Sequence, residues 1–219
     1  TKIRHDGSWV EAETPRGTVR AKHIIITVST GVLAFGNIEF EPDLPPEYTQ
    51  AFFDLPMGML TKIPLEIPAR QFGLKAFEDL LIERPARHDI YLLACPFDLD
   101  LMVGLVGGDF AWEMSVAGEH AARDFAIDRL AGILGNDVRH KVGRSMMTNW
   151  GAEPFVRGAY AAARPGKASA RDILALPVNE RIWFAGEALA GGLIQTCGGL
   201  VQALAMRWLS EAARKRSEK

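Results

Sequence analysis

The sequence predicts an α+β fold, and three patterns of apolar residues predict it. Two short runs rich in β-branched or aromatic residues, 23–28 and 182–185, are typical of strands covered on both faces. Two further apolar runs, 91–95 and 101–106, are joined by a short loop with a proline and two aspartates, which indicates an antiparallel pair. Apolar residues recur at helical spacing over 116–134 and again after residue 198.

Length and composition fit a globular protein of one large or two small domains. The 219 residues are 48% apolar and 24% charged, and the net charge of −2 offers no basic surface for nucleic acid or an anionic membrane. No apolar run reaches membrane-spanning length. The distant Cys95 and Cys197 indicate a reducing compartment, and the five histidines show no metal-ligand spacing. We therefore expect a cytoplasmic protein with no metal, nucleic-acid or membrane partner.

The first third of the chain carries signals for two turns and a buried strand. Residues 2–13 alternate in polarity around Asp6-Gly7, which predicts a hairpin. A second turn at 14–17 leads to the run 23–28, whose β-branched residues favour a parallel strand.

Prolines mark the next segment. Residues 41–46 form an extended connector, and Pro46 is suitably placed to begin a short helix that ends near Asp54. A strand over 55–66 follows, in which Lys62 alone would indicate a solvated strand edge. Pro64 removes a ladder donor, which favours an edge or a bulge there.

The middle of the chain is less regular. The stretch 77–82 fits a strand or a helix, and 84–89 fits a turn. The helix over 116–134 is expected to stop at Gly135-Asn136. Residues 138–147 are strand-like and lead to Trp150.

The C-terminal stretch predicts a strand, a turn and a helix. The run 182–185 stops at Gly186-Glu187, and a glycine-rich loop follows. Thr196 can cap the next helix, whose first N–H groups could face a negatively charged or electron-rich ligand. An ordinary α/β unit has the same pattern, so this stretch alone does not identify a ligand.

Four motifs resemble one family, the FAD-dependent amine oxidases, which include monoamine oxidases, polyamine oxidases and flavin-type histone lysine demethylases. The motifs are FAGEA with T-x-x-G nine residues after its glutamate, a TVPLGVL-like crossing at 27–33, G-x-x-x-K at 58–62, and W-x-x-x-P-F-x-x-G-A-Y at 150–160. Ser29 stands where the family's crossing has proline. The resemblance covers nearly the whole chain.

The resemblance implies two residues close to the chemistry. Lys62 matches the lysine that projects toward the reactive nitrogen of the flavin and holds a water there, and Tyr160 matches a tyrosine that lines the substrate passage. Ala159 occupies the position of the cysteine that links the flavin covalently in monoamine oxidases, so FAD is expected to bind non-covalently.

The resemblance also implies a set of cofactor-binding residues. Glu187 would lie beside the ribityl and pyrophosphate region, and the backbone N–H of Cys197 would stabilise charge on the reduced flavin. Alternatively, Glu187 is a hydrogen-bonded carboxylate at a strand end, and the thiol of Cys197 is a packing group. The full set is Trp150, Gly186, Glu187, Thr196 and Cys197.

The resemblance further implies a division into domains, and it shows that one sequence motif needed for dinucleotide binding is absent. It assigns 1–34 and 148–219 to pieces of an FAD domain and 35–147 to a substrate domain with a mixed or antiparallel sheet and flanking helices. Dinucleotide binding needs a G-x-G-x-x-G turn, yet the sequence contains no G-x-G triplet. We therefore expect the C-terminal part of an enzyme whose N-terminal FAD-binding half is a required partner.

The expected function is FAD-dependent oxidation of a primary or secondary amine to an imine, with O2 as the electron acceptor and a small-molecule amine as the substrate. Two alternatives stay open. One is another oxidoreductase of the superfamily, of the desaturase or protoporphyrinogen-oxidase type, against which Lys62 argues. The other is a degenerate interaction module that kept the fold and lost the cofactor.

Overall fold

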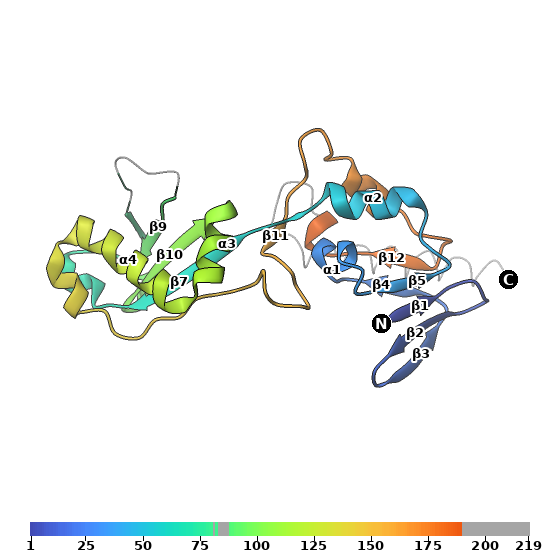
Figure 1. Cartoon of the computed structure of the whole chain (residues 1–219), viewed down its shortest axis with the longest axis horizontal. Coiled ribbons are helices and arrows are strands. Elements are labelled where there is room, and N and C mark those ends of the chain that lie inside the picture. Colours follow the sequence, from blue (N-terminus) through green and yellow to red (C-terminus); the bar gives the residue numbers. More distant parts are fainter. Residues whose placement is uncertain (81, 83–87, 190–219) are drawn as a thin grey trace. The chain divides into compact units, whose positions relative to one another are not determined.

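The computed structural model describes residues 1–80, 82 and 88–189, which form two compact units with separate cores. Unit 1 contains Thr1–Met57 and the described residues from Pro154 onward, and unit 2 contains Gly58–Glu153. Each unit combines helices with a small sheet (Figure 1), which confirms the α+β class. No helix of the described residues is both long and apolar enough to span a bilayer.

Unit 1 contains a four-stranded sheet of order β3-β2-β1-β5, in which β1 is antiparallel to β2 and parallel to β5. The expected hairpin is present, but its loop spans five residues. One face buries Ile3 and Val10. The other face carries an ion-pair ladder in which Lys2 pairs with Glu39 and Glu41, and Arg4 pairs with Glu13 and Glu41. The strands are β1 (Lys2–Arg4), β2 (Val10–Thr14), β3 (Gly17–Ala21) and β5 (Glu39–Glu41).

A second sheet in unit 1 pairs β4 (Ile24–Ile26) with β12 (Ile182–Phe184). The pairing is parallel, as the sequence predicts for the first of these strands. Ile26 and Phe184 point into the core, but Ile25 is 37% exposed, so the prediction that both faces are covered is wrong for β4.

The described part of unit 1 also contains three α-helices. The helix α2 (Pro46–Asp54) has the predicted bounds, because Pro46 occupies the first turn, where its missing N–H costs nothing. It packs on α5 (Ala170–Leu174). The short α1 (Thr30–Ala34) follows β4 directly. The rings of Phe40, Tyr48 and Phe52 surround Phe184 in the core.

Unit 2 is built on an antiparallel sheet of order β7-β10-β9-β8, and α3 and α4 cover one of its faces (Figure 1). The antiparallel pair predicted from the two middle apolar runs is confirmed as β9 and β10. The elements are β7 (Leu60–Glu66), β8 (Glu78–Leu80), β9 (Tyr91–Ala94), β10 (Leu101–Gly107), α3 (Gly108–Ala117) and α4 (Glu119–Leu134), with short 3-10 turns η1 (Ala69–Phe72) and η2 (Pro96–Asp98).

The strand predicted over 138–147 is wrong. Its first part is the 3-10 helix η3 (Asn136–His140). The chain then runs beside β7, where the N–H of Met146 donates to the carbonyl of Pro64 and the N–H of Thr148 donates to that of Lys62. Because Pro64 has no N–H to return, this side of β7 forms an isolated bridge instead of a regular ladder.

The helix predicted over 116–134 begins earlier and is divided. Gly118, with φ of 91°, separates α3 from α4. The start of α3 at Gly108 was missed because Gly107-Gly108 resembles a stop signal. Residues 35–57 pack within unit 1, although the sequence assigns them to a substrate domain. Which unit binds cofactor and which binds substrate stays a prediction.

Candidate functional site

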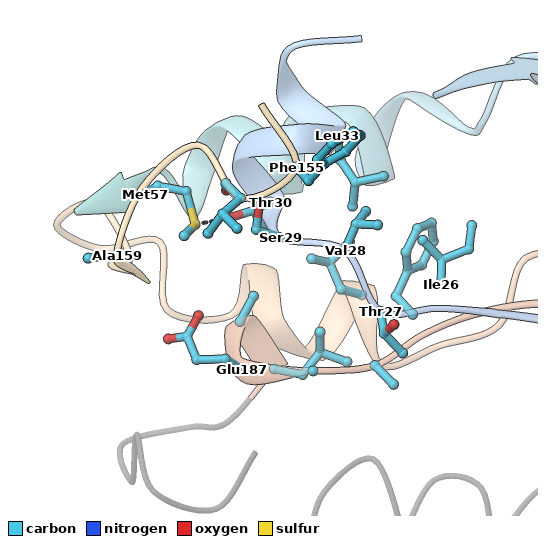
Figure 2. A pocket seen from close by; sticks show the side chains of 17 residues that line it. Ile26, Thr27, Val28, Ser29, Thr30, Leu33, Met57, Phe155, Ala159 and Glu187 are labelled. Atoms are coloured by element: carbon cyan, nitrogen blue, oxygen red, sulfur yellow. Dashed lines mark hydrogen bonds between the residues drawn. The ribbon is translucent and has the colours of Figure 1, made fainter. Parts of the chain in front are cut away.

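A cavity of about 290 Å³ lies within unit 1 (Figure 2). Among the described residues that line it, most are apolar, and Thr27, Ser29, Thr30 and Glu187 carry polar side chains. The remaining lining residues come from three regions of the chain: Ile26, Val28 and Leu33; Met57; and Phe155, Val156, Ala159, Leu174, Phe184, Ala185, Gly186, Ala188 and Leu189.

The parallel strands β4 and β12 both end at this cavity. The residues after β4, Thr27 to Ser29, and those after β12, Ala185 to Glu187, supply facing parts of its wall. Gly186 has φ of 132°, a conformation that favours glycine, and a β-carbon there would meet the Thr27 carbonyl oxygen at 3.6 Å. The carboxyl ends of parallel strands are where ligands bind in α/β sheets.

Glu187 begins the short 3-10 turn η4 (Glu187–Leu189) and is half-buried. Its two carboxylate oxygens accept the backbone N–H of Ala161 at 3.0 and 3.1 Å. Ala161 belongs to β11 (Tyr160–Ala161), so this bond fixes the strand that carries Tyr160 beside η4. The strand-end carboxylate expected as the alternative is therefore present, at the cavity.

The first turn of α1 supplies another part of the wall. Ser29 is the N-cap, and its Oγ accepts the N–H of Val32 at 3.2 Å and donates to the carbonyl of Val156. Thr30 donates to the carbonyl of Leu55 at 2.7 Å and contacts the sulfur of Met57, the contact dashed in Figure 2. Sequence reasoning missed both residues as cavity walls, although a serine before a helix is a recognisable cap signal.

Lys62 lies in unit 2 on β7, and its side chain is exposed. Its neighbours on β7, Thr61 and Ile63, face the core, so Lys62 points to the face of the sheet that α3 and α4 leave uncovered. Thr148 holds its backbone twice, because the N–H of Lys62 donates to Thr148 Oγ1 at 2.9 Å and the N–H of Thr148 donates to the Lys62 carbonyl at 3.0 Å.

The structure distributes the predicted site residues over both units. Gly186 and Glu187 line the cavity. Tyr160 is half-buried and directly precedes Ala161, whose backbone N–H donates to Glu187. Lys62 and Trp150, which is 47% exposed, belong to unit 2. Thr196 and Cys197 lie outside the described residues. In the part of the chain that the structure describes, no group of three potential metal ligands occurs.

Three of the cavity residues that sequence reasoning missed share one signal. Thr27, Val28 and Ser29 lie at or directly after the end of the run 23–28, which is predicted to be a parallel strand, and the ends of such strands are the usual ligand positions. Met57 and Phe155 carry no comparable signal, because they reach the cavity only through the packing of distant segments.

A family model described as "Flavin containing amine oxidoreductase" matches residues 1–202. The chain is 30% identical over 197 residues to lysine-specific histone demethylase 1 homolog 2 of Oryza sativa subsp. japonica, covering 85% of this chain and 26% of that protein. It is also 30% identical over 200 residues to polyamine oxidase 4 of the same organism, covering 86% of this chain and 39% of that protein. The chain thus spans about a quarter to two fifths of the length of these relatives.

Solved structures show the same fold. A cyclohexylamine oxidase from Brevibacterium oxydans superposes with a TM-score of 0.72 at 23% identity, covering 94% of this chain and 47% of the other. A putrescine oxidase variant superposes with a TM-score of 0.80 at 19% identity, covering 96% of this chain and 48% of the other. At such identities the likeness establishes the fold alone.

Proposed function

Because the chain belongs to the flavin containing amine oxidoreductase family, we propose that it takes part in the FAD-dependent oxidation of a primary or secondary amine to an imine. The proposed electron acceptor is O2, and the proposed substrate is a small-molecule amine. Bound FAD would supply the capacity to take a hydride equivalent from the carbon beside the amine nitrogen, and the protein would position and tune it.

The observation that carries the proposal is the meeting of two parallel strands at one cavity. Thr27 to Ser29 and Ala185 to Glu187 approach it from β4 and β12, so backbone groups at both strand ends are available to a ligand. Parallel strands that end at a hollow are the usual position of a dinucleotide in α/β folds.

The cavity fits a part of FAD. Its volume of about 290 Å³ lies just below the roughly 300–1,000 Å³ of complete ligand pockets. Its largely apolar wall suits a flat ring, and its few hydroxyl and carboxylate groups could hydrogen-bond a ribityl chain. Ala159 offers a methyl group, which cannot form a thioether, so the proposed binding is non-covalent.

Gly186 and Glu187 are the described residues proposed to hold the cofactor. The absence of a side chain at Gly186 lets a ligand approach the backbone. The Glu187 carboxylate can accept hydrogen bonds from ribityl or ribose hydroxyls, whereas it would repel a phosphate. We propose the same role for Trp150, Thr196 and Cys197 from the family motifs that they match.

Lys62 and Tyr160 are proposed as the residues next to the substrate. The Lys62 ammonium would hold a water molecule through one of its three donors, and its exposed position on β7 leaves these donors available. Tyr160 would line the substrate passage. The hydrogen bond from Ala161 to Glu187 would keep Tyr160 beside the cofactor.

We also propose that the chain binds FAD together with a second half of the enzyme, the glycine-motif half, which carries the G-x-G-x-x-G turn. No G-x-G triplet occurs in the sequence, and the pyrophosphate of a dinucleotide needs such a turn.

Peroxide release from a panel of primary and secondary amines tests the proposal, with the protein isolated from its own cells. Amine-dependent peroxide is the expected result. A protein that contains FAD but releases no peroxide with any amine would favour a desaturase-type oxidoreductase, and one without FAD would favour a non-catalytic module.

A further inference from the structure

The first turn of α1 contacts both stretches of chain that connect the two units. Leu55 to Met57 end the first stretch of unit 1, and Pro154 to Arg157 begin its second stretch. Ser29 Oγ donates to the carbonyl of Val156, in the returning stretch. The same oxygen accepts the N–H of Val32, so its orientation is fixed by the helix that it caps.

Thr30 holds the departing stretch. Its hydroxyl donates to the Leu55 carbonyl at 2.7 Å and lies 3.4 Å from the sulfur of Met57. Thr30 is 2% exposed and Leu55 is fully buried, so water cannot replace this donor without local opening.

The backbone between these two hydroxyls is tightly packed. A β-carbon at Gly31 would lie 2.8 Å from both the Arg157 carbonyl oxygen and Met57 Cγ. The Arg157 guanidinium lies 3.5 Å from the centroid of the Phe35 ring, at the end of α1, and Asn37 donates to the Pro154 carbonyl at 3.3 Å. Both connecting stretches are therefore held by α1 and its flanks.

Both hydroxyls stand at positions where the sequence departs from the family pattern quoted above. In the family's TVPLGVL pattern these positions hold proline and leucine, which have no side-chain donor, whereas here they hold Ser29 and Thr30. Each hydroxyl has a carbonyl partner on a different connecting stretch.

We propose that Ser29 and Thr30 form a two-point clamp that fixes where the chain leaves unit 1 and where it returns. Lys62 follows the departing stretch by five residues, and Tyr160 follows Arg157 by three. The clamp residues are thus positioning residues for Lys62 and Tyr160, a role that rests on the proposed function. The clamp itself does not depend on that function.

Hydrogen exchange of the whole 219-residue chain tests the clamp. Thr30→Val keeps the side-chain volume and removes the donor, and it should speed exchange in 55–58 by about fivefold or more. Ser29→Ala should speed hydrogen exchange in residues 154–158 to a similar extent. Thr30→Ser, which restores the hydroxyl, should return exchange to the native rate, while exchange of β7 and β10 reports that unit 2 stays folded.

Unchanged exchange in both connecting stretches would overturn the clamp, as would equal effects of Thr30→Val and Thr30→Ser. The positioning role is tested in the protein isolated with FAD, where Thr30→Val should lower kcat several-fold with little change in KM. Full kcat in that variant would overturn the positioning role. Failure of the proposed function is a different result, because the unsubstituted protein would then oxidise no amine while the exchange effects remained.

Discussion

At the scale of single residues, Lys62 carries the most specific expectation. Replacing Lys62 with Met keeps the length of the side chain and removes the ammonium. If the lysine holds a water molecule that takes part in the reaction, turnover should fall about a hundredfold or more. Flavin absorbance of the isolated protein should be retained, since Lys62 belongs to unit 2 and not to the described cavity.

Lys141→Met is the matched control, because Lys141 is also an exposed lysine of unit 2 but lies outside the proposed site. Peroxide release measured at saturating amine compares the two variants. Equal turnover of both variants would contradict the role of Lys62.

Glu187 carries a separate prediction, on stability. Glu187→Ala leaves the buried N–H of Ala161 without its acceptor, which should lower the free energy of unfolding by about 1–3 kcal/mol. Glu187→Gln keeps an acceptor oxygen, so its free energy of unfolding should fall by less. Urea denaturation of the chain measures both, and an Ala variant as stable as the native chain would contradict the anchoring bond.

At the scale of elements, α1 depends on close approach at Gly31. The substitution Gly31→Ala would force a methyl group against the Arg157 carbonyl and Met57, so it should destabilise the chain by about 1–3 kcal/mol. Gly132→Ala, on the exposed side of α4 with open space around it, should instead stabilise by about 0.5–1 kcal/mol. Thermal unfolding distinguishes the two, and equal shifts would argue against tight packing of α1.

The ion-pair ladder on β1 and β5 predicts that the stability of the fold depends on pH. Hydrogen bonding from Lys2, and then from Arg4, lowers the pKa of Glu41 below its ordinary value of 4.5. A carboxylate whose pKa is lowered by folding stabilises the fold above its unfolded pKa, and this contribution disappears as the pH falls through the folded pKa.

Glu41→Gln should therefore be less stable than the native chain at neutral pH and equal to it below the lowered pKa of Glu41. Denaturant unfolding at both pH values measures the difference. Because Glu41 is exposed, the difference should be small and should shrink with added salt. A difference that persists in acid would contradict the ladder as its cause.

The elements show what sequence reasoning can and cannot provide. The helix α2 and the β9–β10 pair follow from local signals, Pro46 and two apolar runs around a turn. The start of α3 at Gly108 was missed because glycine has a low helix propensity, which tertiary packing overrides here. The strand predicted over 138–147 does not form: its first part is η3, and the irregular pairing of the residues that follow is set by Pro64, which lies about eighty residues earlier.

The candidate site shows a similar division. Gly186 and Glu187 could be found from a motif, and the cavity contains both. The clamp formed by Ser29 and Thr30 could not, because its partners Val156 and Leu55 are distant in sequence and accept through backbone carbonyls. A carbonyl is present at every residue, so its use leaves no trace in composition or spacing.

At the scale of the whole molecule, the chain belongs to the flavin amine oxidoreductases and consists of two units that are each built on a separate core. The chain by itself should bind FAD weakly, because the glycine motif that admits the pyrophosphate is not in its sequence. Quenching of flavin fluorescence on titration measures this affinity. Purification of the 219-residue chain as a yellow protein would contradict the prediction.

The most direct measurement is the absorbance of flavin in the chain isolated from its own cells together with the proposed glycine-motif half, followed during anaerobic addition of amines. The predicted result is bleaching by at least one primary or secondary amine, with recovery of the absorbance and release of peroxide when O2 is admitted. Bleaching should be far slower in Lys62→Met. Flavin that no amine bleaches, or a protein isolated without flavin, would contradict the assignment of this chain to amine oxidation.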